Sequence, residues 1–505
     1  MPLPEGIVVN RATFTPSGKV LISYTKGNEV GRDFTRLAIL NPDGTGMHPF
    51  FAQEIPIIPG SGGINLMILP DDRRIYTGNY VIECQQVLAE CENPQLLPVE
   101  FPAELAPDRK FMHKHWSEVI VSPDNEHVAW TPQFKNDRAM VLTGRLEKQE
   151  GGYRIADARI VSTLDAFAPD PNHPDGVLPE PIRSGEVKQF VEGGTAISLA
   201  ANGDYYAWDT NLLHLDEGRD EIITQSPGYT ESVIFSPDER LGMVMTTRFS
   251  EPTNPAVLGL MPRPYVDNLN MGLGRFVYTY AVAGVRRSRP GNIGPALIEI
   301  DKSKAQPGYQ GINLNTDKDW VYQSPMSWHP SGKMAMWQEG RRDAEGDRIQ
   351  IVRLPDYQPG PTVAPQPFPD LAYSHSDLSL VRPYAEEGLA VDVKVYGRDS
   401  GYLTYRRTPD HLIEKTYHNY SDDGLNFYSG TERMEGHFDA RSTYTADLKL
   451  SGPTRGETKL KVTFGPLRDN LPAQIIFDED ETGTPLSYGY AQYGSRRLEV
   501  SSLAP

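Results

Sequence analysis

Pairs of short apolar runs recur along the first three quarters of the chain, and a tight polar turn separates the two runs of each pair. The runs are rich in Val, Ile, Leu and aromatic residues, and the turns are built from Pro, Asp, Asn, Ser and Gly. Two such runs around such a turn predict a two-stranded β-hairpin. The pattern occurs in ATFTPSGKVLISYT (12–25), INLMILPDDRRIYTG (64–78), SEVIVSPDNEHVAW (117–130), AISLAANGDYYAW (196–208), ESVIFSPDERLGMVM (231–245) and MSWHPSGKMAMW (326–337).

Weaker apolar runs follow the hairpins, for example RLAILNPDG and RIQIVRLPDY. A unit of four strands, repeated along a chain, is typical of a β-propeller. Six units are clear, and we expect a seventh near residues 364–383 or within one of the insertions. The sequence therefore predicts an all-β protein in which residues 1–383 form a propeller of six to eight blades, with seven favoured. The alternative is a sandwich of unrelated hairpins.

The pattern changes after residue 383, where longer alternating runs such as VDVKVYGRDSGYLTYRR and STYTADLKLSG appear. The Pro-rich segment QPGPTVAPQPFPD (358–370) lies shortly before this change. Alternation over such lengths predicts antiparallel strands. We expect residues 384–505 to form a separate C-terminal β-domain of a sandwich-like kind. Alternatively, YSDDGLNFYSG belongs to a last blade.

The Ser-Pro-Asp turns of these units resemble those of PD40 or TolB-like propeller repeats. The resemblance covers roughly residues 5–380 and implies the fold, but not an activity, because such propellers include both enzymes and binding proteins. Two further segments, 78–102 and 417–432, resemble secreted propellers related to saponin hydrolase, which cleave glucuronides. That resemblance implies secretion and a glycoside substrate, and it assigns no catalytic residue.

Charge and cysteine content limit the partners and the compartment. The formal net charge is −18, which disfavours binding to nucleic acid or to anionic lipid. No apolar stretch is long enough to span a membrane. The two cysteines, Cys84 and Cys91, are close together and predict a small disulfide loop; two unrelated buried thiols are the alternative. A disulfide favours a secreted or periplasmic protein. Because the first residues do not resemble a signal peptide, either the signal peptide has been removed or the protein is cytosolic.

Propeller geometry predicts which residues meet. The tight turns lie on one face, here called the turn face. The chain reaches the first strand of each unit on the opposite face, here called the approach face, together with the loops between strands two and three. We expect the approach face to carry Asn10, Arg11, Asn65, His113, His115, Trp116, Glu118, Glu192, Asp209, Tyr229, Glu231, Arg248, Tyr322, Gln323, Gln338 and Glu339. The insertion 251–275 is expected to fold over this face. Such a convergence of polar groups at a channel mouth indicates a site.

Standard nucleophile, phosphate and zinc motifs are absent from the sequence. Carboxylates, histidines, arginines and aromatic residues remain, and this set suits a sugar substrate. Glycoside hydrolysis needs two carboxyl groups, one of them an acid with a raised pKa. The candidates are Glu118 and Glu231 as a first pair, with Asp209 and Glu192 in reserve. The expected substrate-binding residues are Arg11, Asn65, His113, His115, Trp116, Tyr229, Arg248, Gln338 and the more distant His375.

The sequence thus predicts a glycoside hydrolase acting on a glucuronide or a similar small glycoside or oligosaccharide. One alternative is a polysaccharide lyase that removes a proton from a uronic acid. The other is a propeller that binds carbohydrate or protein without catalysis. We expect no cofactor, although His113 and His115 leave a divalent metal open as a possibility.

Overall fold

The structure is a computed structural model. It describes the chain apart from residues 27–33, 57–64, 107–109, 116–117, 137, 181–183, 203–207, 226–228, 232, 251–270, 288–292, 343–345, 387–389, 438–439, 467–472 and 505. The side chains of His113, Lys114, Asn202, Trp208, Met271 and Arg287 are also outside the description. None of the described helices is long and apolar enough to span a membrane.

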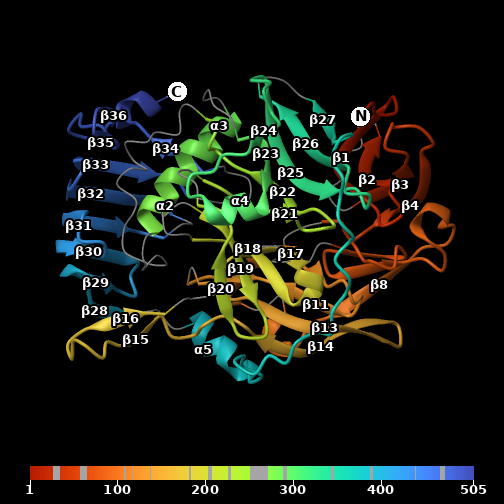
Figure 1. Ribbon diagram of the computed structural model, residues 1–505, viewed down its shortest axis with the longest axis horizontal. Helices are drawn as coiled ribbons and strands as arrows, with labels where there is room; N and C mark the ends of the chain where they lie inside the picture. Colours follow the sequence, from red (N-terminus) through yellow and green to blue (C-terminus); the bar gives the residue numbers. More distant parts are fainter. Residues whose placement is uncertain are drawn as a thin grey trace.

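Six sets of antiparallel strands follow one another along the described part of residues 7–353 and form the blades of a β-propeller (Figure 1). Blade 1 contains β1 (Ile7–Phe14), β2 (Val20–Lys26), β3 (Phe34–Leu40) and β4 (His48–Glu54). Blade 2 contains β5 (Met67–Ile68), β6 (Arg74–Thr77), β7 (Tyr80–Glu83) and β8 (Gln95–Glu100). Blade 3 contains β10 (Ile120–Val121), β11 (His127–Trp130), β13 (Leu142–Gln149) and β14 (Gly152–Ile160). Blade 4 contains β17 (Glu186–Val191), β18 (Ala196–Asn202), β19 (Trp208–His214) and β20 (Arg219–Ile222). Blade 5 contains β21 (Ile234–Phe235), β22 (Leu241–Met245), β23 (Pro295–Glu299) and β24 (Ile312–Asn313). Blade 6 contains β25 (Trp320–Trp328), β26 (Met334–Arg341) and β27 (Asp347–Arg353).

The first strand of each blade is the innermost one. Neighbouring first strands contact each other from β5 through β10, β17, β21 and β25 to β1, and blades 1 and 2 share a buried apolar core, so the blades form a ring. Side chains join blades 6 and 1: Gln338 Oε1 accepts from Ala12 N at 3.2 Å, and Ser327 Oγ accepts from Phe14 N at 3.0 Å. Blades 2 and 3 are additionally joined at their outer edges, where β8 and β14 pair in parallel.

The described residues form six blades, at the lower end of the predicted range. Residues 364–383, where a seventh was expected, belong instead to a strap that crosses the turn face. The Pro-rich chain there is extended and bonds to the turns of successive blades: Val363 N to Pro237 O at 2.9 Å, Gln366 N to Gly193 O at 2.9 Å, and the Phe368 ring stacked on His127 at 3.8 Å. The strap therefore covers turns on this face.

Five of the six predicted hairpins are the first two strands of a blade, in blades 1, 2, 3, 5 and 6. The prediction for the fourth unit is wrong by one strand. The segment 196–208 was taken as strands one and two, but Ala196–Asn202 is the second strand and pairs with both β17 and β19. The tight turn of blade 4 is Glu192-Gly-Gly-Thr195, in which Gly193 and Gly194 have φ of 71° and 107°. Glycine adopts such angles without steric strain.

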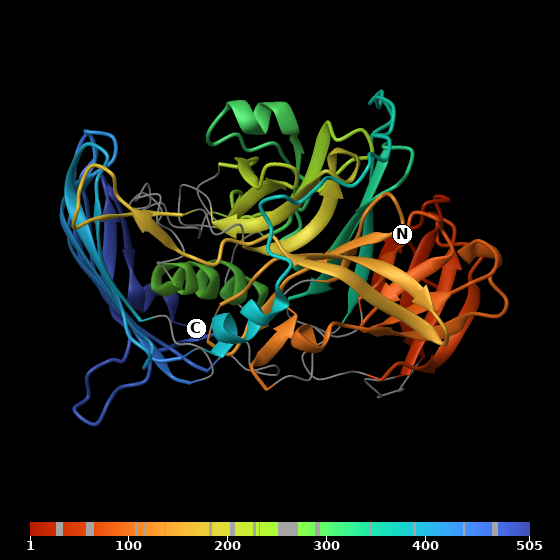
Figure 2. The same cartoon turned by 90° about the horizontal axis from the view of Figure 1, so that it is seen from below.

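The C-terminal region forms one nine-stranded antiparallel sheet in the described residues, seen as the curved blue layer in Figure 2. Its strands are β28 (Val391–Tyr396), β29 (Ser400–Arg407), β30 (Leu412–Ser421), β31 (Phe427–Glu435), β32 (Ser442–Ser451), β33 (Gly456–Phe464), β34 (Ile475–Ile476), β35 (Tyr488–Tyr493) and β36 (Arg496–Glu499). YSDDGLNFYSG joins β30 to β31 in this sheet. A sandwich-like domain was expected, but the layer opposite the buried face is a helical segment inserted into blade 5, not a second sheet.

That helical segment is continuous through α2 (Met271–Val277), η4 (Tyr278–Ala283) and α3 (Gly284–Arg287). The remaining elements are β9 (Met112–His115), β12 (Pro132–Phe134), β15 (Phe167–Pro169), β16 (Val177–Pro179), α4 (Ile300–Ala305), α5 (Val381–Glu386) and the short helices η1 (Leu88–Glu90), η2 (Ala103–Leu105), η3 (Glu192–Gly194), η5 (Leu378–Leu380) and η6 (Val500–Leu503). Cys84 and Cys91 form the predicted disulfide beside η1.

Candidate functional site

The approach face carries a cluster of charged side chains at the beginning of the inner strands of blades 3, 4 and 5. Lys188 of β17 is its centre: its Nζ lies 2.6 Å from Glu186 Oε1 and 3.8 Å from Glu118 Oε2. Glu118 precedes β10, and Glu231 precedes β21. Because the inner strands of a propeller run in the same direction, their starts gather at one end of the channel.

A β-bulge in β17 places Lys188. Val187 pairs with Leu199 and Gln189 pairs with Ser198, so Lys188 is the extra residue between them. A bulge changes the direction of a side chain and is common beside active sites. Here it leaves only 14% of the Lys188 side chain exposed, next to a Glu186 side chain that is 19% exposed.

Tyrosines and an arginine complete the cluster. Tyr229 precedes β21, Tyr322 belongs to β25, and Tyr278 and Arg286 come from the inserted helical segment. The rings of Tyr229 and Tyr278 are in edge contact, with centroids 5.5 Å apart. The charge of Glu231 acts on all four of these groups, which places it among them. We call the set Glu118, Glu186, Lys188, Tyr229, Glu231, Tyr278, Arg286 and Tyr322 the channel-mouth cluster.

Burial and charge set the proton affinities of this cluster. Burial raises the pKa of Glu186 to about 7, and the carboxylates of Glu231 and Glu118 add to the effect against the opposing charge of Lys188. Burial alone would lower the pKa of Lys188, but the surrounding carboxylates outweigh it and raise the pKa well above its usual value. Both groups therefore hold a proton more tightly, since one ammonium is shared among several carboxylates.

This arrangement supplies a proton donor near neutral pH. Glu186 can be protonated at pH 7 and can still ionise, which is what general acid catalysis requires. Lys188 keeps its charge and is therefore not a nucleophile. Burial, followed by the charge of Glu231, raises the pKa of Tyr229 well above its usual value, and the same causes raise the pKa of Tyr322. These tyrosines are consequently poor bases.

The structure brings four residues predicted for the approach face together in the cluster, Glu118, Tyr229, Glu231 and Tyr322. It adds Glu186, Lys188, Tyr278 and Arg286, which the sequence reasoning missed. The signal for the first two was the sequence Glu186-Val-Lys188 directly before the Glu-Gly-Gly-Thr turn. With that turn placed correctly, both would have been read as first-strand residues. Tyr278 and Arg286 lie beyond the end of the insertion that was considered, and no local pattern marks them.

Glu192 is not at the approach face, and its predicted placement is wrong. It begins the tight turn of blade 4, and its backbone N–H donates to Glu239 Oε1 in the turn of blade 5 at 2.8 Å. It therefore lies on the turn face. The error follows from the one-strand shift in blade 4. The segment before Ala196 was taken as the approach to the first strand, whereas it is the turn that follows the first strand.

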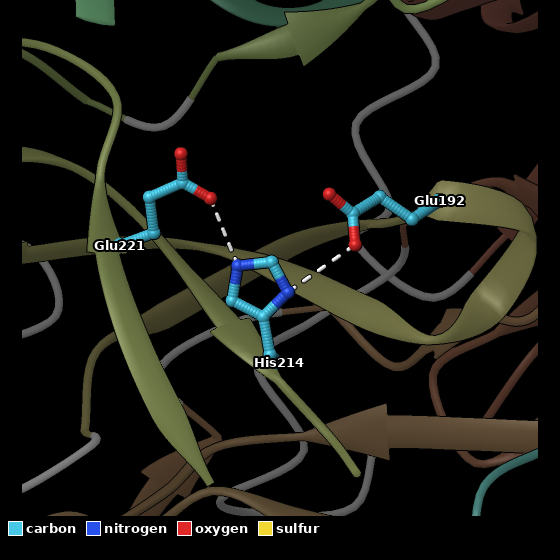
Figure 3. A group of neighbouring side chains, drawn as sticks. All are labelled: Glu192, His214 and Glu221. Carbon is cyan, nitrogen blue, oxygen red and sulfur yellow. Dashed lines mark hydrogen bonds and ion pairs between the residues drawn. The ribbon is translucent and has the colours of Figure 1, made fainter. Parts of the chain in front are cut away.

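Glu192 is part of a group with His214 and Glu221 (Figure 3). Glu192 Oε2 lies 3.2 Å from Nδ1 of His214, whereas Glu221 Oε2 lies 2.9 Å from Nε2. Lys304 Nζ is also 2.8 Å from Glu221 Oε1. A metal ion binds one ring nitrogen, so carboxylates held on opposite nitrogens do not fit one ion. The geometry is that of a histidine bonded between two carboxylates.

Asp209 and Arg248 lie at the approach end of blades 4 and 5, but they form a separate buried group. Asp209 Oδ1 accepts from Thr224 Oγ1 at 2.7 Å. Arg248 donates to Thr246 Oγ1 at 3.0 Å and to Tyr309 O at 2.7 Å. Burial lowers the pKa of Arg248 to about 10, and the carboxylate of Asp209 opposes that shift. These contacts join strands within the blades.

Four other predicted substrate-binding residues are not part of the channel-mouth cluster. Gln338 is buried in the contact between blades 6 and 1, and Arg11 donates to the neighbouring Asn10 O at 3.1 Å. His375 is exposed and bridges to Ile160 at the end of β14 through its backbone. Asn65 is half-buried before β5. Trp116 and the side chain of His113 lie outside the described residues, so their predicted roles stay predictions.

His115 is a packing residue. It is 3% exposed, its ring lies against Phe101 with centroids 5.4 Å apart, and its Nε2 has no hydrogen-bond partner in the described part of the chain. Burial lowers the pKa of His115 to about 4. A substrate-binding role was predicted for His115, whereas the structure buries its ring against Phe101.

The buried His115 predicts an acid-sensitive contribution to stability. The unfolded chain binds a proton at this ring below about pH 6.5, whereas the folded chain does so only near pH 4. Stability is thus complete above pH 6.5 and falls as the pH drops toward 4, by up to about 3 kcal/mol. We expect His115→Leu to flatten this part of the curve in urea unfolding between pH 6.5 and 4. His375→Leu is the exposed control, and equal slopes for the two variants would refute the assignment.

Comparisons with known proteins concern the fold only. No family model matches the chain. No curated protein matches it. Solved structures similar to it include a protein described as a TolB from Agrobacterium tumefaciens, with 12% identity over 64% of this chain and 86% of that chain at a TM-score of 0.37. The β-propeller domain of the Trilobed protease from Pyrococcus furiosus has 9% identity over 82% and 96% at 0.30. Prolyl oligopeptidase B from Galerina marginata has 8% identity over 82% of this chain and 47% of its own at 0.32.

These similarities are distant, and the fold assignment rests on the strand order. Sheets of consecutive antiparallel strands arranged in a ring define a β-propeller. The chain is therefore a β-propeller protein with an appended antiparallel sheet. The resemblance to the saponin hydrolase propellers stays a prediction.

Proposed function

We propose that this protein is a glycoside hydrolase that cleaves a glucuronide or similar small glycoside at the channel-mouth cluster. The observation that carries the proposal is Glu186, a buried carboxyl group whose pKa is raised to about 7 beside two further carboxylates. A glycosidase needs such an acid to protonate the leaving oxygen, together with a second carboxylate that acts as base or nucleophile.

Glu186 is the acid in this proposal, and Glu231 is the second carboxylate. Glu231 acts electrostatically on Lys188 and Arg286, two cations that offset its negative charge. Glu118 Oε2 lies 3.8 Å from Lys188 Nζ and helps to compensate the ammonium. Tyr278, the partly exposed tyrosine of the cluster, offers a hydroxyl and a ring surface, which suit the hydroxyls and the apolar face of a sugar.

Lys188 and two tyrosines of the cluster, Tyr229 and Tyr322, are poor candidates for the base that the lyase alternative needs. Removal of a proton beside a uronate carboxyl group needs a base near neutral pH. The tyrosines hold their protons tightly because of burial and the charge of Glu231, and Lys188 stays protonated among its carboxylates.

The Cys84–Cys91 disulfide supports an oxidising compartment and hence a secreted or periplasmic protein.

A panel of aryl glycosides that includes glucuronides and deoxysugars tests the proposal. We expect release of the free aglycone together with a saturated sugar. An unsaturated sugar product would identify a lyase instead. Binding of a glycoside without turnover over the whole panel would identify a binding protein.

A further inference from the structure

The inserted helical segment of blade 5 connects two parts of the molecule that are far apart in the sequence. Figures 1 and 2 show it between the C-terminal sheet and the blades, in green beside the blue strands. Its first turns in α2 contact β31 and β32, and α3 contacts β25 of blade 6. One end of the segment therefore rests on the C-terminal sheet and the other on the propeller.

Arg275 fixes the first end. Its Nη1 donates to Ser442 Oγ at 2.6 Å, its Nη2 donates to Gly465 O at 2.9 Å, and its guanidinium lies 4.8 Å from the centroid of Phe464. Arg275 is only 8% exposed. Charged donors that are buried and bonded in this way hold one geometry and are costly to remove.

Gly272 allows the close approach at this end. A β-carbon at position 272 would lie 2.5 Å from the Tyr444 ring in β32, so a larger residue would push the helix away from the sheet. The apolar face of the segment, with Phe276 and Tyr280, is fully buried in the same core as Leu448 and Val462 of the sheet. The helical segment and the C-terminal sheet therefore share a buried, closely packed interface.

The other end reaches the channel-mouth cluster. Tyr278 meets the ring of Tyr229, and Arg286 interacts electrostatically first with Glu231 and then with Tyr278 and Tyr229. Arg342 of blade 6 donates to the carbonyl of Val285, which holds this end against the propeller. The middle of the segment is a π-helix, a form found frequently at functional sites.

We propose that the C-terminal sheet is required for the geometry of the channel-mouth cluster. It holds the helical segment so that Tyr278 and Arg286 complete the channel-mouth cluster, and Arg275 is a positioning residue for Arg286. This inference rests on the proposed function in one respect only, which is that turnover occurs at the cluster. The sheet would then be required for turnover although it contributes no residue to the cluster itself.

Hydrogen exchange tests the positioning without any substrate. We expect Arg275→Gln to raise amide exchange in residues 278–287 and in the cluster segment 229–235, while segment 20–26 of blade 1 stays unchanged. Arg497→Gln, which changes an exposed arginine of the same sheet, is the control and should leave all three segments unchanged. Ser442→Ala removes one of the two hydrogen bonds and should give a smaller effect in the same places. Unchanged exchange in 278–287 for the folded variants would overturn the inference.

A double-mutant cycle tests the functional coupling. Arg275→Gln should lower kcat/KM about 100-fold, because a small displacement of a positioning group is enough for such a loss. In an Arg286→Ala background the same change should cost less than about twofold, since the group that it positions is already gone. Equal costs in both backgrounds would show that Arg275 acts only through general stability and would overturn the inference.

The two proposals fail in distinguishable ways. If the wild-type protein cleaves no glycoside, the proposed function fails, and the exchange in 278–287 and 229–235 still decides the positioning claim. If it cleaves a glycoside and Arg275→Gln raises exchange without loss of turnover, the claim that this positioning is required for turnover fails. The proposed hydrolase function then stands.

Discussion

Glu186→Gln is expected to lower kcat about 10²- to 10⁴-fold on a glycoside with a poor leaving group, because the variant has lost its general acid. Glutamine has nearly the same shape and retains a polar contact to Lys188, so the fold should persist. The loss should be much smaller on an activated aryl glycoside, since a good leaving group departs without protonation. Steady-state kinetics on a matched pair of substrates measures both effects.

Glu239→Gln is the matched control for this change. Glu239 is also a propeller glutamate whose pKa is raised by burial, but it lies on the turn face and accepts from the backbone of Glu192. We expect it to leave kcat within about twofold of the wild type, as for a residue outside the reacting groups. Equal losses for Glu186→Gln on both leaving groups would contradict an acid role.

The second large effect concerns Lys188. Lys188→Met removes the largely buried ammonium that interacts with Glu118, Glu186 and Glu231, which leaves these partly buried carboxylates without that cation. Breaking a buried charge cluster on one side typically costs about 3–5 kcal/mol. The loss should be largest at high pH. Without the ammonium, the pKa of Glu186 rises further above about 7, so the folded chain must ionise an unfavourable carboxyl as the pH increases.

Urea unfolding at pH 5 and pH 8 measures this difference. The double variant Glu186→Gln with Lys188→Met should recover part of the loss at pH 8, because one of the buried carboxylates is gone. Lys302→Met is the control, since it breaks an ion pair with Glu299 at 2.6 Å whose two side chains are about half exposed. Such a pair contributes at most about 1 kcal/mol. An equal cost for Lys188→Met and Lys302→Met would refute a buried cluster.

The fold was largely predictable because its signals are local. The turns of blades 1, 2, 3, 5 and 6 contain Pro followed by Ser-Gly or by Asp, and each marks the hairpin that the structure contains. Blade 4 was misread because its turn, Glu192-Gly-Gly-Thr195, lacks Pro and Asp, whereas Ala-Asn-Gly-Asp204 matches a turn better. The end of a strand cannot be distinguished from its beginning by alternation alone.

The site was predictable only in part because it is made by long-range placement. The placement of Glu118, Tyr229, Glu231 and Tyr322 followed from the direction of the inner strands. The position of the Lys188 side chain depends on a β-bulge, which the pairing of β17 with β18 shows and the sequence does not. Arg286 reaches the cluster through a helical segment that the C-terminal sheet holds, and no spacing in the sequence links residues 286 and 442. His115 was singled out because it lies among several polar and aromatic residues, yet its ring packs against Phe101, in a core that also contains Trp130.

A crystal structure of the Glu186→Gln variant with an uncleaved glycoside tests the central claim most directly. The account predicts that the glycosidic oxygen lies within hydrogen-bond distance of the new side-chain amide at position 186, with Glu231 on the other side of the anomeric carbon and Arg286 at the sugar. A glycoside bound at the turn face, at the outer edge of the blades or on the C-terminal sheet, with the channel-mouth cluster empty, would contradict it.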